Sequence, residues 1–448
     1  MLTTDLIIIG AGPGGYETAL LAARRGLTVA LIERSEVGGT CLNEGCIPTK
    51  ALCRTASMIA DFNEAAAYGL ADAGFSLDFA AVMARKRAVV EQLRGGVATL
   101  LAHPNIHLVK GEARFVDALT VEAGGETIKA NDVIIATGST AATLPIEGNT
   151  LDGVLTSSEL LDIDSVPESL CIVGAGVIGL EFASVFNTMG SDVTVLEYAK
   201  EVLPHFDSDL AKRLRQSLGK RGIKIETQAA VQSIAEADGM LEVAYERKGK
   251  QQSVKAQKVL MAVGRRANVG SLNLADIGVE FSPRGIAVDE RMQTNVAHVY
   301  AVGDVNGKMM LAHAATFQGI RALNAIMGID DSLRLDVIPA AVFTMPEVGT
   351  VGLTEDDCKE QGIAYTAKKA FFRANGKAVC LGETEGYCKL IVADDGRLLG
   401  CHIYGPHTAD LVQEACALIT RGASLADLQS IVHSHPTLSE IVQMAAHS

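Results

Sequence analysis

The sequence has 448 residues, 48% of them hydrophobic and 21% charged, which is more chain than one hydrophobic core usually serves, so we expect two to four globular domains. Its net charge of −14 would repel phosphate backbones and anionic lipid surfaces, so nucleic acids and membranes are not expected as partners. Aromatic residues make up only 4%, with no tryptophan, which disfavours a surface for stacking bases.

The cysteines and the N-terminal residues bear on the cellular compartment. Nine scattered cysteines do not resemble the disulfide framework of a secreted protein. The opening MLTTDLIIIG has no basic region before its short apolar run, so it predicts a strand rather than a signal peptide. No apolar run reaches the roughly 18 residues of a spanning helix. We therefore expect a cytoplasmic protein, where a close cysteine pair is more often catalytic or metal-binding than structural.

The first predicted elements form a strand–turn–helix–strand unit. Residues 5–9 are an apolar run that leads into the loop GAGPGG at 10–15, as in a buried parallel strand. A helix follows up to Gly26, and residues 27–33 form a second strand. This order is the context that a dinucleotide-binding glycine loop requires.

The glycines of this loop each have a physical reason. Gly10 allows the tight turn, Gly12 lets the backbone approach a pyrophosphate, and Gly15 lets the helix pack closely on the strand. The helix N-terminus offers free N–H groups to the phosphates. Glu33 ends the second strand, where its carboxylate can accept hydrogen bonds from ribose hydroxyls.

The stretch GGTCLNEGCIPTK at 38–50 places Cys41 and Cys46 five positions apart. A disulfide that closes so short a loop would stabilise the fold by only roughly 2 kcal/mol. Positions five apart on a regular helix point about 140° away from each other, so a bond requires an irregular helix, and Gly45 supplies the freedom. A strained short-loop disulfide is easily reduced, which suits a catalytic pair.

Two further uses of these residues stay open. Cys41 and Cys46 could join His433 and His435 as four zinc ligands, although nothing beside the cysteines looks ligand-like. Lys50 could lower a thiol pKa or pair with an electron-rich ring, but an exposed helical lysine fits the sequence equally well.

A helical stretch over roughly 50–101 and a strand-and-turn region to about 131 follow. Three later segments each predict a buried strand that is followed by a glycine turn, and they lie at 132–139, 259–266 and 299–305. From about Ile338 the pattern changes to that of an antiparallel sheet with helices.

A second strand–turn–helix–strand unit begins at Leu170. Its loop GAGVIG contains Gly174, Gly176 and Gly179, and the second strand again ends in a glutamate, Glu197. No arginine adjoins Glu197, and a carboxylate would repel a 2′-phosphate, so NAD is favoured over NADP. Two loops imply two dinucleotides, for which NAD and a flavin are the natural pair.

Two motifs identify a family resemblance. CLNEGC resembles the redox motif of the class I pyridine nucleotide–disulfide oxidoreductases, and HSHPTLSE at 433–440 resembles the C-terminal motif of their dihydrolipoyl dehydrogenase branch. The order GAGPGG, CLNEGC, ATGS, GAGVIGLE, VGRR, VGDV, HPTLSE runs through nearly the whole chain. The first hypothesis is a member of this branch. The alternative is another NAD(P)H-dependent disulfide reductase of the same family, and a non-enzymatic flavin-bound scaffold is a third hypothesis.

The resemblance implies an α/β fold with tandem Rossmann-like FAD- and NAD-binding domains and an α+β C-terminal dimerisation domain. The FAD domain would span 1–140, completed by a central segment at 265–335, with the NAD domain at 141–264 and the dimerisation domain at 336–448. The protein would be a homodimer with an active site across both subunits, no metal, and a lipoyl-bearing subunit of a 2-oxo acid dehydrogenase or glycine cleavage system as its partner.

The resemblance also assigns site residues. Those for FAD are Gly10, Gly12, Gly15, Glu33, Lys50, Ala113, Gly138, Asp304 and Ala312. Those for NAD are Gly174, Gly176, Gly179, Glu181, Glu197 and Gly264, with Glu181 close to both rings. Cys41 would exchange with substrate, Cys46 would face the flavin, and His435 would be the acid–base oriented by Glu440.

These implied roles fit an oxidation of dihydrolipoamide to lipoamide with reduction of NAD⁺. Thiolates are the nucleophiles of disulfide exchange, and a histidine can take up the thiol proton near neutral pH. Glu440 also has a structural explanation, because Thr437 and Glu440 form the T-x-x-E pattern of a helix capping box. His433 is expected to be a bystander or a supporting polar group.

Overall fold

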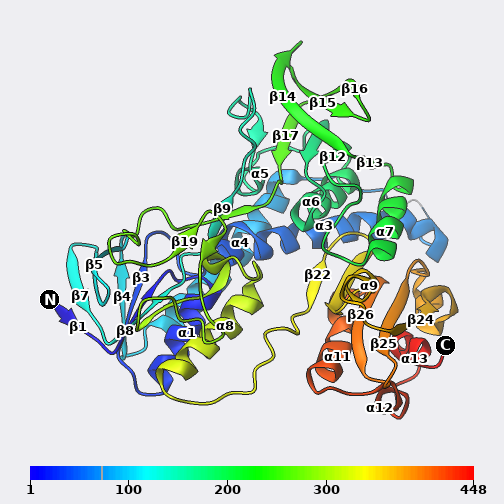
Figure 1. The fold of residues 1–448 in the computed structure, drawn as a ribbon. Helices are drawn as coiled ribbons and strands as arrows, with labels where there is room; N and C mark the ends of the chain where they lie inside the picture. The colour runs from blue at the N-terminus through cyan, green and yellow to red at the C-terminus, as the bar shows by residue number, and fades with distance from the viewer. Residues whose placement is uncertain (72–73) are drawn as a thin grey trace. The chain divides into compact units, whose positions relative to one another are not determined.

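The computed structural model describes residues 1–71 and 74–448, and the chain divides into two compact units (Figure 1). The first unit comprises Met1–Ala51, Ala80–Ala142 and Gly264–Leu335. The second comprises Leu52–Phe79, Thr143–Val263 and Asp336–Ser448. Within the described residues, no helix has the length and apolar character needed to cross a membrane.

A parallel five-stranded sheet forms the centre of the first unit. In spatial order its strands are β21 (Val299–Ala301), β8 (Asp132–Ile135), β2 (Leu6–Ile9), β3 (Val29–Glu33) and β4 (Ile106–Lys110). Leu6 and Ile8 pack into one apolar cluster, whereas Ile7 and Ile9 pack into another. Because alternate residues of a strand face opposite sides, both faces of the sheet are covered, and this explains the uninterrupted apolar run.

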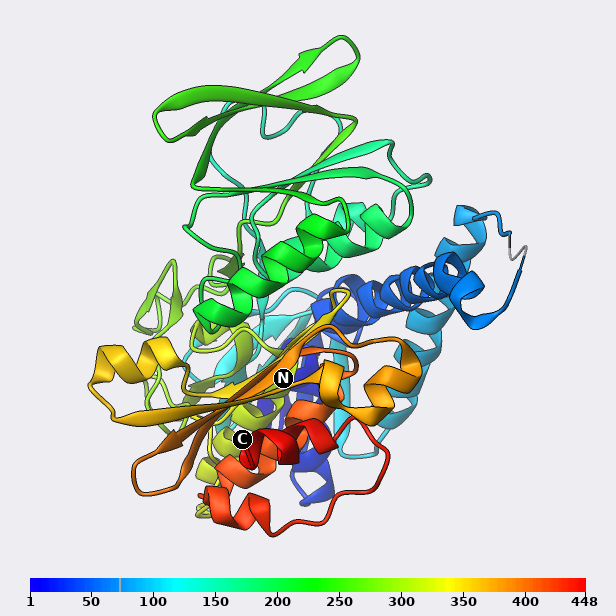
Figure 2. The same cartoon turned by 90° about the vertical axis from the view of Figure 1, so that its right-hand side faces the viewer.

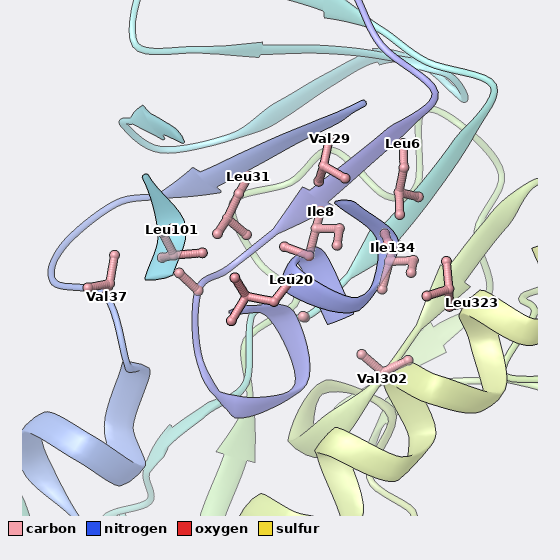
Figure 3. Close-up of a cluster of buried hydrophobic side chains, with 14 of the residues drawn as sticks. Leu6, Ile8, Leu20, Val29, Leu31, Val37, Leu101, Ile134, Val302 and Leu323 are labelled. Atoms are coloured by element: carbon pink, nitrogen blue, oxygen red, sulfur yellow. The ribbon is translucent and has the colours of Figure 1, made fainter. Parts of the chain in front are cut away.

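Two helices pack side by side in this unit, α1 (Pro13–Arg24) and α8 (Ala312–Ile326). Small residues permit the contact, since a Cβ on Gly319 would lie 1.9 Å from the Oγ1 of Thr18. Figure 3 shows Leu20 and Leu323 from these helices among the side chains of the sheet. The helix α4 (Phe79–Leu101) adds Leu101 to the same cluster.

Smaller sheets complete the first unit. They are the four-stranded sheet β1 (Leu2–Thr3), β7 (Glu126–Lys129), β6 (Thr120–Ala123) and β5 (Arg114–Asp117), and the pairs β18 (Arg265–Ala267) with β9 (Ser139–Ala141) and β19 (Phe281–Ser282) with β20 (Gly285–Ile286). The short helix η2 (Gly303–Asn306) follows β21 directly.

The second unit contains another parallel five-stranded sheet. Its strands are β10 (Val154–Leu155), β17 (Lys258–Met261), β11 (Ser169–Val173), β12 (Asp192–Glu197) and β13 (Lys224–Thr227). The helices of this region are α5 (Ser157–Leu160), α6 (Val177–Thr188) and α7 (Ser208–Lys220). Between β13 and β17, the chain forms a separate antiparallel sheet of β14 (Ala229–Ala237), β15 (Met240–Arg247) and β16 (Lys250–Ala256).

The C-terminal part of the second unit is the predicted antiparallel sheet with helices, and this prediction is confirmed (Figure 2). The strands are β22 (Ala340–Val342), β23 (Glu347–Gly352), β26 (Leu398–Gly405), β25 (Tyr387–Ala393) and β24 (Tyr365–Phe371). The helices are α9 (Glu355–Gln361), α10 (Gly376–Leu381), α11 (Thr408–Thr420), α12 (Leu425–Gln429) and α13 (Glu440–Ala446). Of these, α11 contacts β23 and β26, and α13 contacts β24 and β25.

The expected helical stretch over 50–101 is wrong in its middle. The helix α3 (Cys46–Glu64) continues as a short 3₁₀ turn to Tyr68 and ends at Gly69, and α4 starts only at Phe79. Gly69 has a φ of +79°, a conformation that a helix cannot continue through. Residues 72–73 of the predicted stretch lie outside the described residues.

Candidate functional site

The first glycine loop requires glycine at two positions for different reasons. Gly10 has a φ of +104°, and a Cβ there would lie 2.3 Å from the carbonyl oxygen of Ala136. A Cβ on Gly15 would lie 1.8 Å from the carbonyl oxygen of Gly10. A Cβ on Gly12 would meet no atom closer than 3.8 Å, so the backbone at the start of α1 faces open space. A pyrophosphate fits this surface, because the free N–H groups of the helix N-terminus point into it.

Glu33 ties the end of β3 to this loop. One carboxylate oxygen accepts a hydrogen bond from the Ala11 N–H at 2.7 Å, and the other accepts from the Ser35 N–H at 2.8 Å. The carboxylate is thereby held beside the loop, and its remaining lone pairs are available to ribose hydroxyls. The side chain is therefore in place before any ligand binds.

The second glycine loop repeats this geometry in the second unit. Gly174 has a φ of +106°, and a Cβ on Gly179 would lie 2.1 Å from the carbonyl oxygen of Gly174. A Cβ on Gly176 would meet nothing within 4 Å. Glu197 accepts from the Ala175 N–H at 2.6 Å and from the N–H two residues after itself at 2.7 Å. The two loops therefore carry the same dinucleotide cradle.

Two other residues predicted for the second dinucleotide lie in different settings. Glu181 is buried on α6, and its Oε1 accepts a hydrogen bond from the Phe343 N–H at 3.0 Å. Gly264 has a φ of +111° and belongs to the first unit, where its carbonyl accepts from the Ala142 N–H. A Cβ at Gly264 would meet nothing within 4 Å, so its backbone is open to a ligand.

The predicted irregularity between the two cysteines is confirmed. The short helix α2 (Gly39–Glu44) carries Cys41, and α3 begins at Cys46. Gly45 separates them with φ −145° and ψ −109°, which is not helical. The break lets both side chains turn toward each other, and the two thiols are hydrogen-bonded. The pair therefore has the proximity that a reversible disulfide needs.

The groups around the cysteine pair shift the pKa of the Cys41 thiol in opposite directions. The hydrogen bond with Cys46 and burial raise the pKa of the Cys41 thiol, while the positive charge of Lys50 lowers it. Lys50 lies one turn into α3, close enough for its charge to act on the thiol. A thiolate formed at this pair would have Lys50 as its counter-charge.

Asp304 is held by two residues that the sequence did not single out. The Ser139 hydroxyl donates to its Oδ2 at 2.5 Å, and the Arg265 Nε donates to the Ser139 Oγ at 2.6 Å. Asp304 lies in η2, directly after the strand β21. Both partners directly follow a glycine, Gly138 or Gly264, at the start of the paired strands β9 and β18, and these positions in the motifs ATGS and VGRR are the signal that could have identified them.

The remaining residues predicted for FAD contribute backbone. Ala113 is buried in the core of the first unit, and Ala312 is the first residue of α8. Gly138 has a φ of +67° with open space at its Cβ position, and its carbonyl accepts from the Asn268 N–H. None of these three can offer a side-chain contact beyond a methyl group.

In the second unit, His435 and Glu440 form a pair. The Nδ1 of His435 lies 2.9 Å from the Glu440 Oε1, and the imidazole is 77% exposed. Glu440 Oε2 accepts from the Thr437 N–H at 2.8 Å. These hydrogen bonds, that from Thr437 first, lower the pKa of the Glu440 carboxyl. Because Glu440 occupies Nδ1, the Nε2 of the ring faces outward and can exchange a proton.

The expected capping box is only half formed. The helix α13 begins at Glu440 with Ser439 as its N-cap, so Thr437 is not the N-cap residue. The Thr437 hydroxyl donates instead to the Ser434 carbonyl at 2.8 Å. Helix capping therefore accounts for the Thr437 N–H contact of Glu440 but not for its contact with His435.

Two other polar side chains hold the segment around His435, and no pattern in the sequence indicated them. The Asn375 amide donates to the Thr437 carbonyl at 3.0 Å, and Glu414 pairs with His433 at 2.9 Å. For the zinc hypothesis, the described part of the chain contains no group of three or more His, Cys, Asp or Glu side chains that could hold a metal ion.

Comparison with known proteins identifies the family of these loops and motifs. Residues 4–319 match the model "Pyridine nucleotide-disulphide oxidoreductase", and residues 338–446 match the dimerisation domain of the same name. The chain belongs to the pyridine nucleotide–disulphide oxidoreductase family. Its C-terminal part is accordingly a dimerisation domain, which indicates a homodimer.

Its relatives in this family share the full length of the chain. Dihydrolipoyl dehydrogenases of Geobacillus stearothermophilus and Staphylococcus aureus are each 38% identical over 99% of this chain and 96% of their own. That of Haloferax volcanii is 39% identical with the same coverage. The HOCl-induced flavoprotein disulfide reductase RclA from Escherichia coli is 29% identical, with a TM-score of 0.88 over 99% of both chains.

These findings confirm several predictions from the sequence. The family and the fold class, with two Rossmann-like domains and a C-terminal dimerisation domain, are confirmed. The prediction of an oxidoreductase enzyme is confirmed, as are FAD and NAD(H) as the cofactors of this family. The two glycine loops, each with an open position and a held carboxylate, fit these two dinucleotides.

Proposed function

We propose that this oxidoreductase oxidises protein-bound dihydrolipoamide to lipoamide and reduces NAD⁺ to NADH through a Cys41–Cys46 disulfide. The observation that carries the proposal is the hydrogen-bonded cysteine pair at the break between α2 and α3. Full-length similarity to dihydrolipoyl dehydrogenases at 38% identity supports this substrate.

The exchange steps use the two cysteines in order. A dihydrolipoamide thiolate attacks the Sγ of Cys41, breaks the disulfide and leaves Cys46 as a thiolate. The second substrate thiolate attacks the mixed disulfide, releases lipoamide and leaves Cys41 reduced. Two electrons and two protons have then left the substrate. Lys50 balances the charge that develops on the cysteines.

His435 takes up the protons that the substrate thiols release. Glu440 receives the Nδ1–H, which fixes the tautomer and leaves Nε2 as the acceptor. A second copy of the chain would supply this histidine, because an active site across both subunits is implied by the resemblance to the family. Bound FAD supplies the electron acceptor for the cysteine pair and the hydride donor for NAD⁺.

The dinucleotides are assigned by segment. FAD would bind in the domain of residues 1–140 and 265–335, held by Gly10, Gly12, Gly15, Glu33 and Asp304. NAD would bind in residues 141–264, held by Gly174, Gly176, Gly179, Glu181 and Glu197. The Glu197 carboxylate would repel a 2′-phosphate, so a clear preference for NADH over NADPH is expected.

The partner is the lipoyl-bearing subunit of a 2-oxo acid dehydrogenase or glycine cleavage system in the cytoplasm. Similarity to dihydrolipoyl dehydrogenases supports the lipoyl group as the substrate. The net charge of −14 supports a partner other than nucleic acid or an anionic membrane.

The test measures dihydrolipoamide-driven reduction of NAD⁺ by the FAD-loaded dimer, with Cys41→Ser as the inactive comparison. Anaerobic titration with dihydrolipoamide should produce a charge-transfer band from a thiolate beside the flavin. Absence of turnover would refute the proposed substrate. The second candidate is a reductase of another disulfide, supported by the 29% identical structure of RclA. A panel of other disulfides, assayed with NADH and with NADPH, tests that candidate.

A further inference from the structure

The segment that carries His435 contains a second, buried histidine. Val432 is 92% exposed and the His435 side chain is 77% exposed, yet the side chain of His433 between them is only 4% exposed. The inward His433 ring therefore anchors the backbone of this surface segment between two side chains that point outward.

Hydrogen bonds hold the His433 ring at both nitrogens. Nε2 lies 2.9 Å from the Glu414 Oε1 on α11, and Nδ1 lies 3.2 Å from the Ile431 carbonyl oxygen. Both oxygens are acceptors, so a neutral ring can donate to one of them, and a ring with a proton on each nitrogen donates to both. The Glu414 carboxylate supplies the opposite charge.

A second anchor lies on the other side of His435. The buried Asn375 side chain donates to the Thr437 carbonyl at 3.0 Å, and the Thr437 hydroxyl closes the turn onto the Ser434 carbonyl. The turn from Ser434 to Thr437 is therefore suspended between α11 and the start of α10, and His435 is inside it.

We propose that His433, bonded to Glu414, is a positioning residue that sets the direction of the His435 imidazole toward substrate. The proposal rests on the function proposed above. His433 acts through the backbone of the turn and not by proton transfer, because its ring nitrogens are occupied by Glu414 and Ile431. A displacement of about 1 Å at a catalytic group can lower the rate by roughly 10²-fold.

The ionisable groups around His433 come from three elements. Glu414 lies on α11, and its charge acts on the Cys388 thiol of β25. Glu440 begins α13, and the charge of His433 helps to lower the pKa of its carboxyl, after the larger effects of Thr437 and His435. Among the described residues, Glu414 and Glu440 are therefore acidic neighbours of the His433 ring, and His435 is a basic one.

The test compares His433→Ala, Glu414→Gln and the double variant with wild type. The control is His107→Ala, which removes the exposed pair of His107 with Glu126 in the first unit. We expect His433→Ala to lower kcat for dihydrolipoamide about 10-fold or more. NADH-to-quinone electron flow and Tm should match the control. The double variant should be no slower than His433→Ala, because both changes remove one interaction.

Comparison of the two reactions separates positioning from a general structural role. The ratio of wild-type to His433→Ala rates should be about 10 or more for the dithiol reaction and close to 1 for NADH-to-quinone electron flow. An unchanged dithiol rate, or equal losses in both reactions, would overturn the proposal.

Side-chain ¹⁵N resonances of selectively labelled histidines give a readout that does not depend on substrate. His433→Ala should shift or broaden the His435 signals, and His107→Ala should not. Wild-type enzyme without dihydrolipoamide turnover would refute the proposed function, whereas unchanged His435 resonances in His433→Ala would refute the positioning role alone.

Discussion

The Nζ of Lys389 lies 2.5 Å from the Oδ1 of Asp207, and neither side chain is exposed to solvent. Asp207 is the N-cap of α7, where it accepts from the Leu210 N–H, and Glu355, in the first turn of α9, is 2.6 Å from the same lysine. One buried ammonium on β25 therefore joins the starts of two helices from distant parts of the sequence.

Lys389→Met should destabilise the second unit by about 3–5 kcal/mol, because it leaves the Asp207 carboxylate buried without its cation. The free energy of unfolding from urea titration, followed by circular dichroism, measures the loss. Lys224→Met is the matched control, since the ion pair of Lys224 with Asp192 is exposed at both ends and should contribute at most about 1 kcal/mol. Equal losses in the two variants would mean that the buried pair adds nothing beyond a surface pair.

His402 should make stability depend on pH. Burial lowers the pKa of this fully buried imidazole, although the charge of Asp207 opposes the effect. The neutral ring is satisfied if Nε2 donates to the Leu353 carbonyl at 2.9 Å and Nδ1 accepts from the Thr350 hydroxyl at 2.5 Å. Because the unfolded chain takes up this proton first, the free energy of unfolding should fall below about pH 6.5, by at most about 1.4 kcal/mol per pH unit.

The measurement is the unfolding free energy between about pH 7.5 and pH 5 for wild type and His402→Gln. Desolvation raises the carboxyl pKa values of the half-buried Glu347 and of Glu383, which would act in the opposite direction, so the difference between the two proteins isolates His402. Parallel curves for wild type and variant would contradict a buried neutral histidine.

The sequence was sufficient to predict the site features that depend on residues close together in the chain. The glycines of both loops and the carboxylates of Glu33 and Glu197 follow from strand–turn–helix–strand spacing, because parallel pairing brings the end of one strand beside the preceding loop. Gly45 likewise predicted the break beside Cys46.

The sequence was insufficient where the partner is remote. Lys389 is a single charged residue in an apolar strand, and the acids to which it donates hydrogen bonds lie 182 and 34 positions away. Nothing near His433 indicates Glu414, because their contact depends on how α11 packs against the chain before α13. The end of the helix at Gly69 was missed for a simpler reason, since a single glycine among helix formers was outweighed by the apolar pattern around it.

Two alanine substitutions in the second loop should separate folding from ligand binding. Gly179→Ala places a Cβ 2.1 Å from the Gly174 carbonyl oxygen and should lower the Tm of the apoprotein. Gly176→Ala meets nothing within 4 Å, so it should leave the Tm unchanged but raise the KM for NADH by about 10-fold or more, because the methyl group occupies the pyrophosphate approach. Normal NADH kinetics in Gly176→Ala would remove the dinucleotide from this loop.

Glu440→Gln tests the assignment of the acid–base pair. The amide can keep its oxygen on the Thr437 N–H, but its NH₂ group then faces the Nδ1 of His435 and selects the tautomer with the proton on Nε2. That tautomer cannot accept a proton from substrate, so kcat for dihydrolipoamide should fall by roughly 10²-fold or more.

NADH-to-quinone flow should be nearly unchanged in this variant, and so should Tm, because the hydrogen bond to Thr437 survives. Stopped-flow measurement of the dithiol half-reaction locates the defect, with Glu126→Gln as a control at an exposed histidine–glutamate pair. A large fall in Tm together with normal specific activity would assign Glu440 to holding the start of α13 rather than to orienting His435.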